Sequence, residues 1–325
     1  MKKQKLTAGV DVSKDTLDIC FNDEQGKEQT LKVANDTKGH ALLFQQLGSK
    51  RTYVMEASGP YYLRLAFLLK TSGADVRVEN PIVVKRFIQM NLERNKTDKK
   101  DAKWLFRFGV EREASVWRLP SKTQLQCAQT LACIDLYMRQ LTQVKNQLHS
   151  LEQMPMKSKE VEKSLKQMVE KLQGEVEGLE QKLQLSLEKW KGAQLKNITS
   201  IPGLGKRAVS LLIVYTEGFT KIQNHRQLIA LAGLAPREHS SGTSVRGRKG
   251  ICKMGNGHLR SVLYMCSLSA IRHNGACKDL YDRLKAKGKG GKVALIAVCN
   301  KLLKQAFAIA TKGTTYKADY VSQLN

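Results

Sequence analysis

The sequence contains no closely paired cysteines and no long apolar run. Its seven cysteines, at positions 20, 127, 133, 252, 266, 277 and 299, are odd in number and form no CxxC pair. Neither a disulfide framework nor a zinc site is therefore predicted, and we expect reduced thiols in the core or on the surface. No apolar stretch approaches the length that spans a bilayer, and the MKKQK start leads into a strand pattern instead of the apolar region of a signal peptide. We expect a cytoplasmic, nucleoid-associated protein.

Acidic residues are also scarce. The 325 residues include 29 Asp and Glu against 55 Lys and Arg, a formal net charge of +26. The segment from Arg237 to Arg260 holds six Arg and Lys with one Glu, and the segment from Arg283 to Lys304 holds seven with no acid. Clustering of this kind is typical of a nucleic-acid footprint and is less typical of a merely solvated face. The partners predicted from charge are therefore DNA or RNA.

The first 120 residues are predicted to form an α/β domain. Strand patterns come first, and helical and strand patterns then alternate, the order expected of a ribonuclease H-like (RuvC-like) fold. The predicted strands lie within residues 5–35 (three strands), 52–57 and 75–78, and the predicted helices cover 37–48, 60–72 and 80–113.

Four carboxylates stand where such a domain could use them. Asp11 lies in the first strand and Glu56 ends the central one, each beside apolar neighbours. Asp98 and Asp101 are spaced i, i+3, which puts them on one face of a helix, with Thr97 as a candidate N-cap. Four carboxylates brought together would repel one another unless cations neutralised them, so the set predicts Mg²⁺ and metal-assisted phosphodiester chemistry. Taken singly, each acid has a structural alternative, as a turn residue or a first-turn helix acid.

Residues 121–193 are predicted to form a helical coiled-coil arm. Apolar residues recur at helical spacing on both sides of Pro155, with a second helix beginning near Lys159. Two such helices indicate an antiparallel hairpin or a self-association arm, and a plain spacer is the alternative, since Gly174 and Gly178 weaken the second helix.

Residues 194–325 are predicted to form a mainly α-helical domain with two phosphate-contacting segments. The first, IPGLGK, resembles the turn of a helix-hairpin-helix element, in which Gly203 and Gly205 would offer backbone N–H groups to a phosphate beside Lys206; a tight turn without a ligand is the alternative.

The second segment is HSSGTSVRGRKG, residues 239–250. Ser241 precedes Gly242 and is the candidate nucleophile, although chemistry alone does not separate it from Ser240. Further expected nucleic-acid contacts are Arg246, Arg248, Lys249, Lys253 and Arg260. Considered by itself, the segment is more typical of a flexible, solvated loop that touches the nucleic-acid backbone without chemistry.

Six motifs, in order along the chain, resemble the DEDD-type insertion-sequence transposases, the family numbered one-ten, whose members are bridge-RNA-guided recombinases. These motifs are GVDVSKDTLD, MEASGPYY, NKTDKKDA, SIPGLGKRAVSLL, LAGLAPREHSSGTSVRGRKG and GHLRSVLYM. The resemblance implies a RuvC-like domain, a coiled-coil arm and a C-terminal transposase domain. It also implies tetramers that act on donor and target DNA, with a structured non-coding RNA choosing both sites.

The resemblance further implies the roles of the site residues. The family's four acids match Asp11, Glu56, Asp98 and Asp101, and its catalytic serine matches Ser241. The acids of one subunit would serve the serine of another, which would form a covalent phosphoserine intermediate with Mg²⁺ assistance. Two other functions stay open: a RuvC-like junction nuclease that uses water, and a non-catalytic nucleic-acid-binding protein.

Overall fold

A computed structural model describes residues 6–91, 98–113, 116–237, 240–241, 245–246 and 250–318. They fall into two compact units, Met1–Pro120 and Ser121–Asn325. Each unit has its own buried apolar core.

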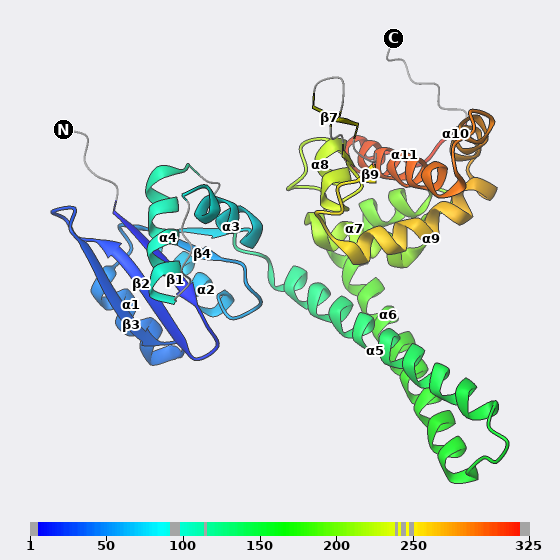
Figure 1. Cartoon of the computed structure of the whole chain (residues 1–325), viewed down its shortest axis with the longest axis horizontal. Coiled ribbons are helices and arrows are strands. Elements are labelled where there is room, and N and C mark those ends of the chain that lie inside the picture. The colour runs from blue at the N-terminus through cyan, green and yellow to red at the C-terminus, as the bar shows by residue number, and fades with distance from the viewer. Residues whose placement is uncertain are drawn as a thin grey trace. The chain divides into compact units, whose positions relative to one another are not determined.

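The first unit is built on a five-stranded mixed sheet (Figure 1). The strand order is β3-β2-β1-β4-β5; the pairs β3–β2 and β2–β1 are antiparallel, and the pairs β1–β4 and β4–β5 are parallel. This arrangement fits the predicted ribonuclease H-like domain, and all five predicted strands are confirmed. The strands are β1 (Thr7–Val12), β2 (Thr16–Asn22), β3 (Glu28–Ala34), β4 (Thr52–Glu56) and β5 (Asp75–Glu79).

Helices cover both faces of this sheet. Leu43 of α1 and Leu65 of α2 pack with Val10 and Met55 of the strands on one face. On the other face, α3 and α4 pack against Val54. The helical stretch predicted from residue 80 onward is thus two helices. The bounds are α1 (Thr37–Leu47), α2 (Leu63–Thr71), α3 (Pro81–Met90) and α4 (Asp98–Glu111).

The second unit begins with two long helices, α5 (Lys122–Glu152) and α6 (Lys159–Thr199), which pack side by side as an antiparallel hairpin (Figure 1). Pro155 lies in the connection between them, as the sequence predicted. A bundle follows, whose core combines residues from the base of the hairpin with the later helices. These are α7 (Lys206–Thr216), α8 (His225–Leu231), α9 (Gly257–His273), α10 (Gly275–Ala286) and α11 (Gly291–Lys312).

The expectation that no apolar run is long enough to span a membrane is wrong for helix α11. Within the described residues it alone passes that test by length and composition, with a mean hydropathy of 1.6. Half of its 18-residue apolar stretch is buried, however, and Val298, Leu302 and Ala306 are fully enclosed by the core of the second unit. Its apolar sequence is therefore explained by its central place in the bundle.

Candidate active site

Strand register brings Asp11 and Glu56 to one end of the sheet. Val10 of β1 pairs with Met55 of the parallel strand β4, so the next residue on each strand is a carboxylate. Val10 and Met55 belong to the core beneath α1 and α2. Since side chains alternate along a strand, Asp11 and Glu56 project from the opposite face, the face that α4 covers.

Helix α4 reaches this face by unusually close packing. A Cβ atom on Gly9 of β1 would lie 2.1 Å from the backbone nitrogen of Phe106 and 2.4 Å from the carbonyl oxygen of Ala102. Further along the helix, a Cβ on Gly109 would lie 2.8 Å from the side chain of Thr7. Helix α4 therefore runs opposite to β1, and its first turn lies at the Asp11 end of the strand. That turn contains Asp98 and Asp101, so the fold brings all the segments that carry the predicted acids to one end of the unit.

The same rung of the sheet carries two acids that the sequence reasoning missed. Asp18 of β2 lies directly opposite Asp11, and Glu79 of β5 lies beside Glu56. Asp18 pairs with Lys32 of β3 at 3.1 Å. Burial raises the pKa of the Glu79 carboxyl above its usual value, and the Arg77 guanidinium partly opposes this rise. Only strand pairing reveals these neighbours, because nothing in their local sequence marks them.

The donors at this end fit a hard divalent cation. Carboxylate oxygens are the ligands that Mg²⁺ prefers, and the chain segments that carry the four predicted acids all reach this end of the unit. Among the described side chains, no three His, Cys, Asp or Glu groups lie close enough to hold one ion. The side chain of Asp98 lies outside the described residues. If Mg²⁺ binds, Asp11, Glu56, Asp98 and Asp101 are the residues that would hold it.

The candidate serine lies in a small β-ribbon of the second unit. Ser240 and Ser241 form β7 (Ser240–Ser241), which pairs antiparallel with β8 (Val245–Arg246). An outer pair, β6 (Pro236–Arg237) and β9 (Gly250–Ile251), flanks this hairpin in the chain. The side chains of Ser240, Ser241 and Arg246, and the whole of Arg248 and Lys249, lie outside the described residues. The described residues of this segment thus include two short paired strands, with Ser241 at the end of the first.

Arg260 holds the base of this ribbon. Its Nη1 donates to the carbonyl oxygen of Ala232 at 3.0 Å and lies 3.5 Å from that of Lys253. Lys253 is exposed, has a left-handed backbone (φ 57°) and donates its N–H to Gly233 O. Arg260 therefore has a structural role that the sequence did not predict, whereas Lys253 is exposed as a nucleic-acid contact requires.

The predicted phosphate-binding turn connects α6 to α7. Gly203 has φ +98°, and a Cβ there would lie 2.7 Å from the Cα of Ala270, so close packing on α9 requires this glycine. Gly205, the N-cap of α7, and Lys206 are both exposed. An open groove of about 730 Å³ runs between this turn and α9.

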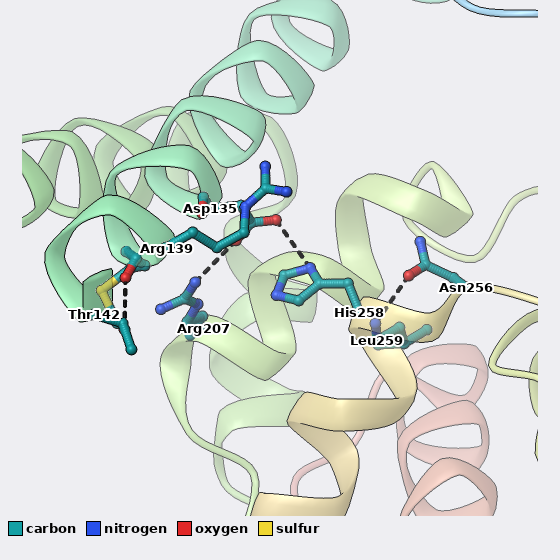
Figure 2. A network of polar contacts seen from close by, with 8 residues as sticks. Asp135, Arg139, Thr142, Arg207, Asn256, His258 and Leu259 are labelled. Carbon is teal, nitrogen blue, oxygen red and sulfur yellow. Dashed lines mark hydrogen bonds and ion pairs between the residues drawn. The ribbon is translucent and has the colours of Figure 1, made fainter. Parts of the chain in front are cut away.

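Asp135 links α5, a helix of the α5–α6 hairpin, to the first turns of α7 and α9 (Figure 2). Its Oδ1 lies 2.9 Å from Arg207 Nη2 in the first turn of α7, and its Oδ2 lies 2.9 Å from His258 Nδ1 in the first turn of α9. The starts of the two helices that follow the predicted phosphate-contacting segments are thus fixed by one carboxylate.

Two of the buried thiols are poorly suited to act as nucleophiles. All seven cysteines are free, as predicted. Burial raises the pKa of Cys277 to about 12 and that of Cys299 to about 11, so these thiols stay protonated and are poor nucleophiles.

Acids at one end of a mixed sheet suit metal-assisted phosphodiester chemistry, and the strongly basic helical unit suits nucleic-acid binding, so together they indicate an enzyme that acts on nucleic acid. Comparison with known families agrees. The DEDD transposase profile of the IS110 group matches residues 8–154, and the profile described as "Transposase IS116/IS110/IS902 family" matches residues 195–282. The chain belongs to the IS110 family of DEDD transposases.

Individual relatives carry related names. The pilin gene-inverting protein of Moraxella lacunata is 27% identical over 312 residues, which cover 94% of this chain and 95% of that protein. The transposase of insertion sequence element IS1111A from Coxiella burnetii is 30% identical over 125 residues, covering 38% of this chain and 34% of that protein. An uncharacterized 43.6 kDa protein of insertion element IS110 from Streptomyces coelicolor is 31% identical over 121 residues, 37% of this chain and 30% of that protein.

Proposed function

We propose that this transposase is an RNA-guided recombinase that exchanges strands between donor and target DNA through a phosphoserine intermediate. The observation that carries the proposal is the convergence of the acid-bearing segments at one end of the sheet, in a chain whose Ser241 lies in a sequence segment rich in Arg and Lys. The name of the Moraxella relative supports recombination, because inverting a gene requires DNA to be cut and rejoined.

The proposed reaction conserves the energy of the phosphodiester bond. Ser241 Oγ loses its proton and attacks the phosphorus, the bond from phosphorus to the 3′ oxygen breaks, and that oxygen takes up a proton as a free hydroxyl. The 3′-hydroxyl of the partner duplex then attacks the phosphoserine, and Ser241 regains its proton. Bound Mg²⁺ would polarise the scissile phosphate. Arg246, Arg248 and Lys249 are proposed to offset the charge that builds up on the phosphate oxygens.

The proposed assembly has three parts. Residues 1–120 carry the acids, residues 121–193 form a coiled-coil arm for self-association to dimers and tetramers, and residues 194–325 carry Ser241 and the helix-hairpin-helix-like turn. In this assembly the acids of one subunit serve the serine of another, and the protein works beside the nucleoid in the cytoplasm. The guide is proposed to be a structured non-coding RNA, so sequencing the RNA that copurifies with the protein, expressed beside its native flanking DNA, tests guidance directly.

Replacing the serine tests the chemistry. Ser241→Ala is expected to abolish strand cleavage and the protease-sensitive protein–DNA adduct seen on denaturing gels, while DNA binding stays near wild type. Ser240→Ala is the matched control and should keep both. Cleavage by Ser241→Ala at the wild-type rate and without an adduct would instead identify a RuvC-like nuclease that uses water. If Asp11→Asn also leaves cleavage unchanged, the acids are structural.

A further inference from the structure

Asn35 links the two loops that follow the acid-bearing strands. Its Nδ2 donates to the carbonyl oxygen of Ser13, two residues after Asp11, at 2.7 Å. The same nitrogen lies 3.5 Å from the carbonyl oxygen of Tyr61, in the loop after Glu56. Because one side-chain amide reaches both loops, it ties the carboxyl ends of β1 and β4 together.

His40 fixes the orientation of this amide. His40 Nε2 lies 2.7 Å from Asn35 Oδ1, and His40 is only 3% exposed. Since Asn35 Nδ2 donates to the carbonyl groups, its Oδ1 must accept, and the hydrogen of the imidazole therefore lies on Nε2. The helical turn that carries His40 is closely packed, because a Cβ on its neighbour Gly39 would lie 2.0 Å from the carbonyl oxygen of Ala34. The first turn of α1 is thus packed directly on the end of β3.

We propose that Asn35, oriented by His40, is a positioning residue of the acidic end and sets the spacing between Asp11 and Glu56. Two carboxylates that share a cation must hold a separation fixed within a fraction of an ångström. The loops after β1 and β4 lie beyond Val10 and Met55, the last pair of those two strands. Asn35 acts by holding the backbone on which the acids stand, and the inference rests on the metal-binding part of the proposed function.

Binding of Mn²⁺, a paramagnetic substitute for Mg²⁺, tests this role without relying on turnover. Free Mn²⁺ is titrated into the full-length chain and followed by electron paramagnetic resonance. Asn35→Ala is expected to weaken binding about tenfold, as the loss of a supporting hydrogen bond typically does at metal sites. His40→Leu should show a similar loss, and His40→Gln, which keeps an N–H donor, should recover most of the affinity.

Two controls separate the outcomes. Tyr53→Phe removes a 2.6 Å hydrogen bond to Gly48 O at the other end of the same sheet, and should leave Mn²⁺ affinity unchanged at a comparable loss of melting temperature. Asp11→Asn should abolish binding. Wild-type affinity in Asn35→Ala, together with loss in Asp11→Asn, overturns the positioning role alone. If Asp11→Asn binds Mn²⁺ as well as wild type, or wild type binds none, the metal site itself is wrong and the positioning role falls with it.

Discussion

Replacing Gly9 with alanine should separate the acidic turn of α4 from the strand that carries Asp11. The added methyl group would lie 2.1 Å from the backbone nitrogen of Phe106, 2.4 Å from the carbonyl oxygen of Ala102 and 2.7 Å from the carbonyl carbon of Leu105. All three are backbone atoms, so no side chain can rotate away to make room. The helix itself must move.

The size of the effect follows from these distances. Carbon atoms in ordinary contact are about 3.5–4.0 Å apart, so α4 must shift by about 1.5 Å. Overpacking of this kind costs about 1–3 kcal/mol of unfolding free energy, or roughly 4–12 °C of melting temperature for a unit of this size. Asp101 moves with the helix, and a displacement of about 1 Å at a reacting centre can lower the rate about 100-fold.

Calorimetry of the full-length chain and a strand-cleavage assay measure the two effects. Gly174→Ala is the matched control, because a Cβ there meets nothing within 4 Å and should stabilise the chain slightly. We expect Gly9→Ala to melt earlier and to cleave far more slowly while still binding DNA. A Gly9→Ala protein with wild-type melting and wild-type cleavage would show that α4 does not rest on β1 as described, and would refute the placement of Asp101.

Two further predictions concern charge and pH. The region around the turn between α10 and α11 is exposed and basic, so a fourfold Lys→Gln variant there should bind duplex DNA more weakly. The slope of log affinity against log salt concentration should fall by about 0.9 for each phosphate that the variant no longer neutralises. Four Lys→Gln changes on α6 should alter neither the affinity nor this slope. Burial lowers the pKa of His40 below 6.5, with Arg64 assisting and Asp36 opposing. As pH falls, the imidazole of His40 is therefore protonated in the unfolded chain before it is protonated in the folded chain, and the folded state loses stability below about pH 6.5. In His40→Gln, the melting temperature should fall less between pH 7 and pH 5 than it does in wild type. A profile that is the same in both proteins would contradict this assignment. The lysines replaced in the fourfold variant are Lys285 near the end of α10, Lys287 and Lys289 in the turn, and Lys292 at the start of α11; the control lysines on α6 are Lys159, Lys163, Lys171 and Lys189.

Much of the first unit could be predicted because its signals are local. Alternating apolar residues predicted the strands, and Asp11 and Glu56 were expected within two of them beside apolar neighbours. Strand register is not local, and so Asp18 and Glu79 were missed. The same limit applies to Asn35, whose partners Ser13 and Tyr61 are 22 and 26 residues away in the chain.

The second unit shows a different limit. IPGLGK predicted a phosphate-binding turn because glycine can leave backbone N–H groups open. Close packing on Ala270, 67 residues later, also requires a glycine at position 203, and Arg260 also donates to a backbone carbonyl oxygen; the contacts of both residues with nucleic acid stay predictions. Residue type states which contacts a side chain is able to make. Only the packing of distant segments decides which of them it makes.

The acidic end illustrates why this distinction matters for the chemistry. The four predicted carboxylates come from three separate stretches of chain, β1, β4 and α4. Residues without charge or reactivity support these stretches: Gly9 admits α4, Asn35 joins the loops after β1 and β4, and Gly39 seats α1, the helix that carries His40. A cation shared between such segments binds only if their backbones keep a fixed separation, so the free energy of metal binding depends on these packing contacts as much as on the oxygens. Substitution of the small supporting residues should therefore impair metal binding while leaving every carboxylate in place. Added Mg²⁺ distinguishes the two kinds of variant. Excess Mg²⁺ should restore activity to a variant that lacks a supporting residue, because its metal site is only weakened. It should not restore activity to a variant that lacks one of the carboxylate ligands.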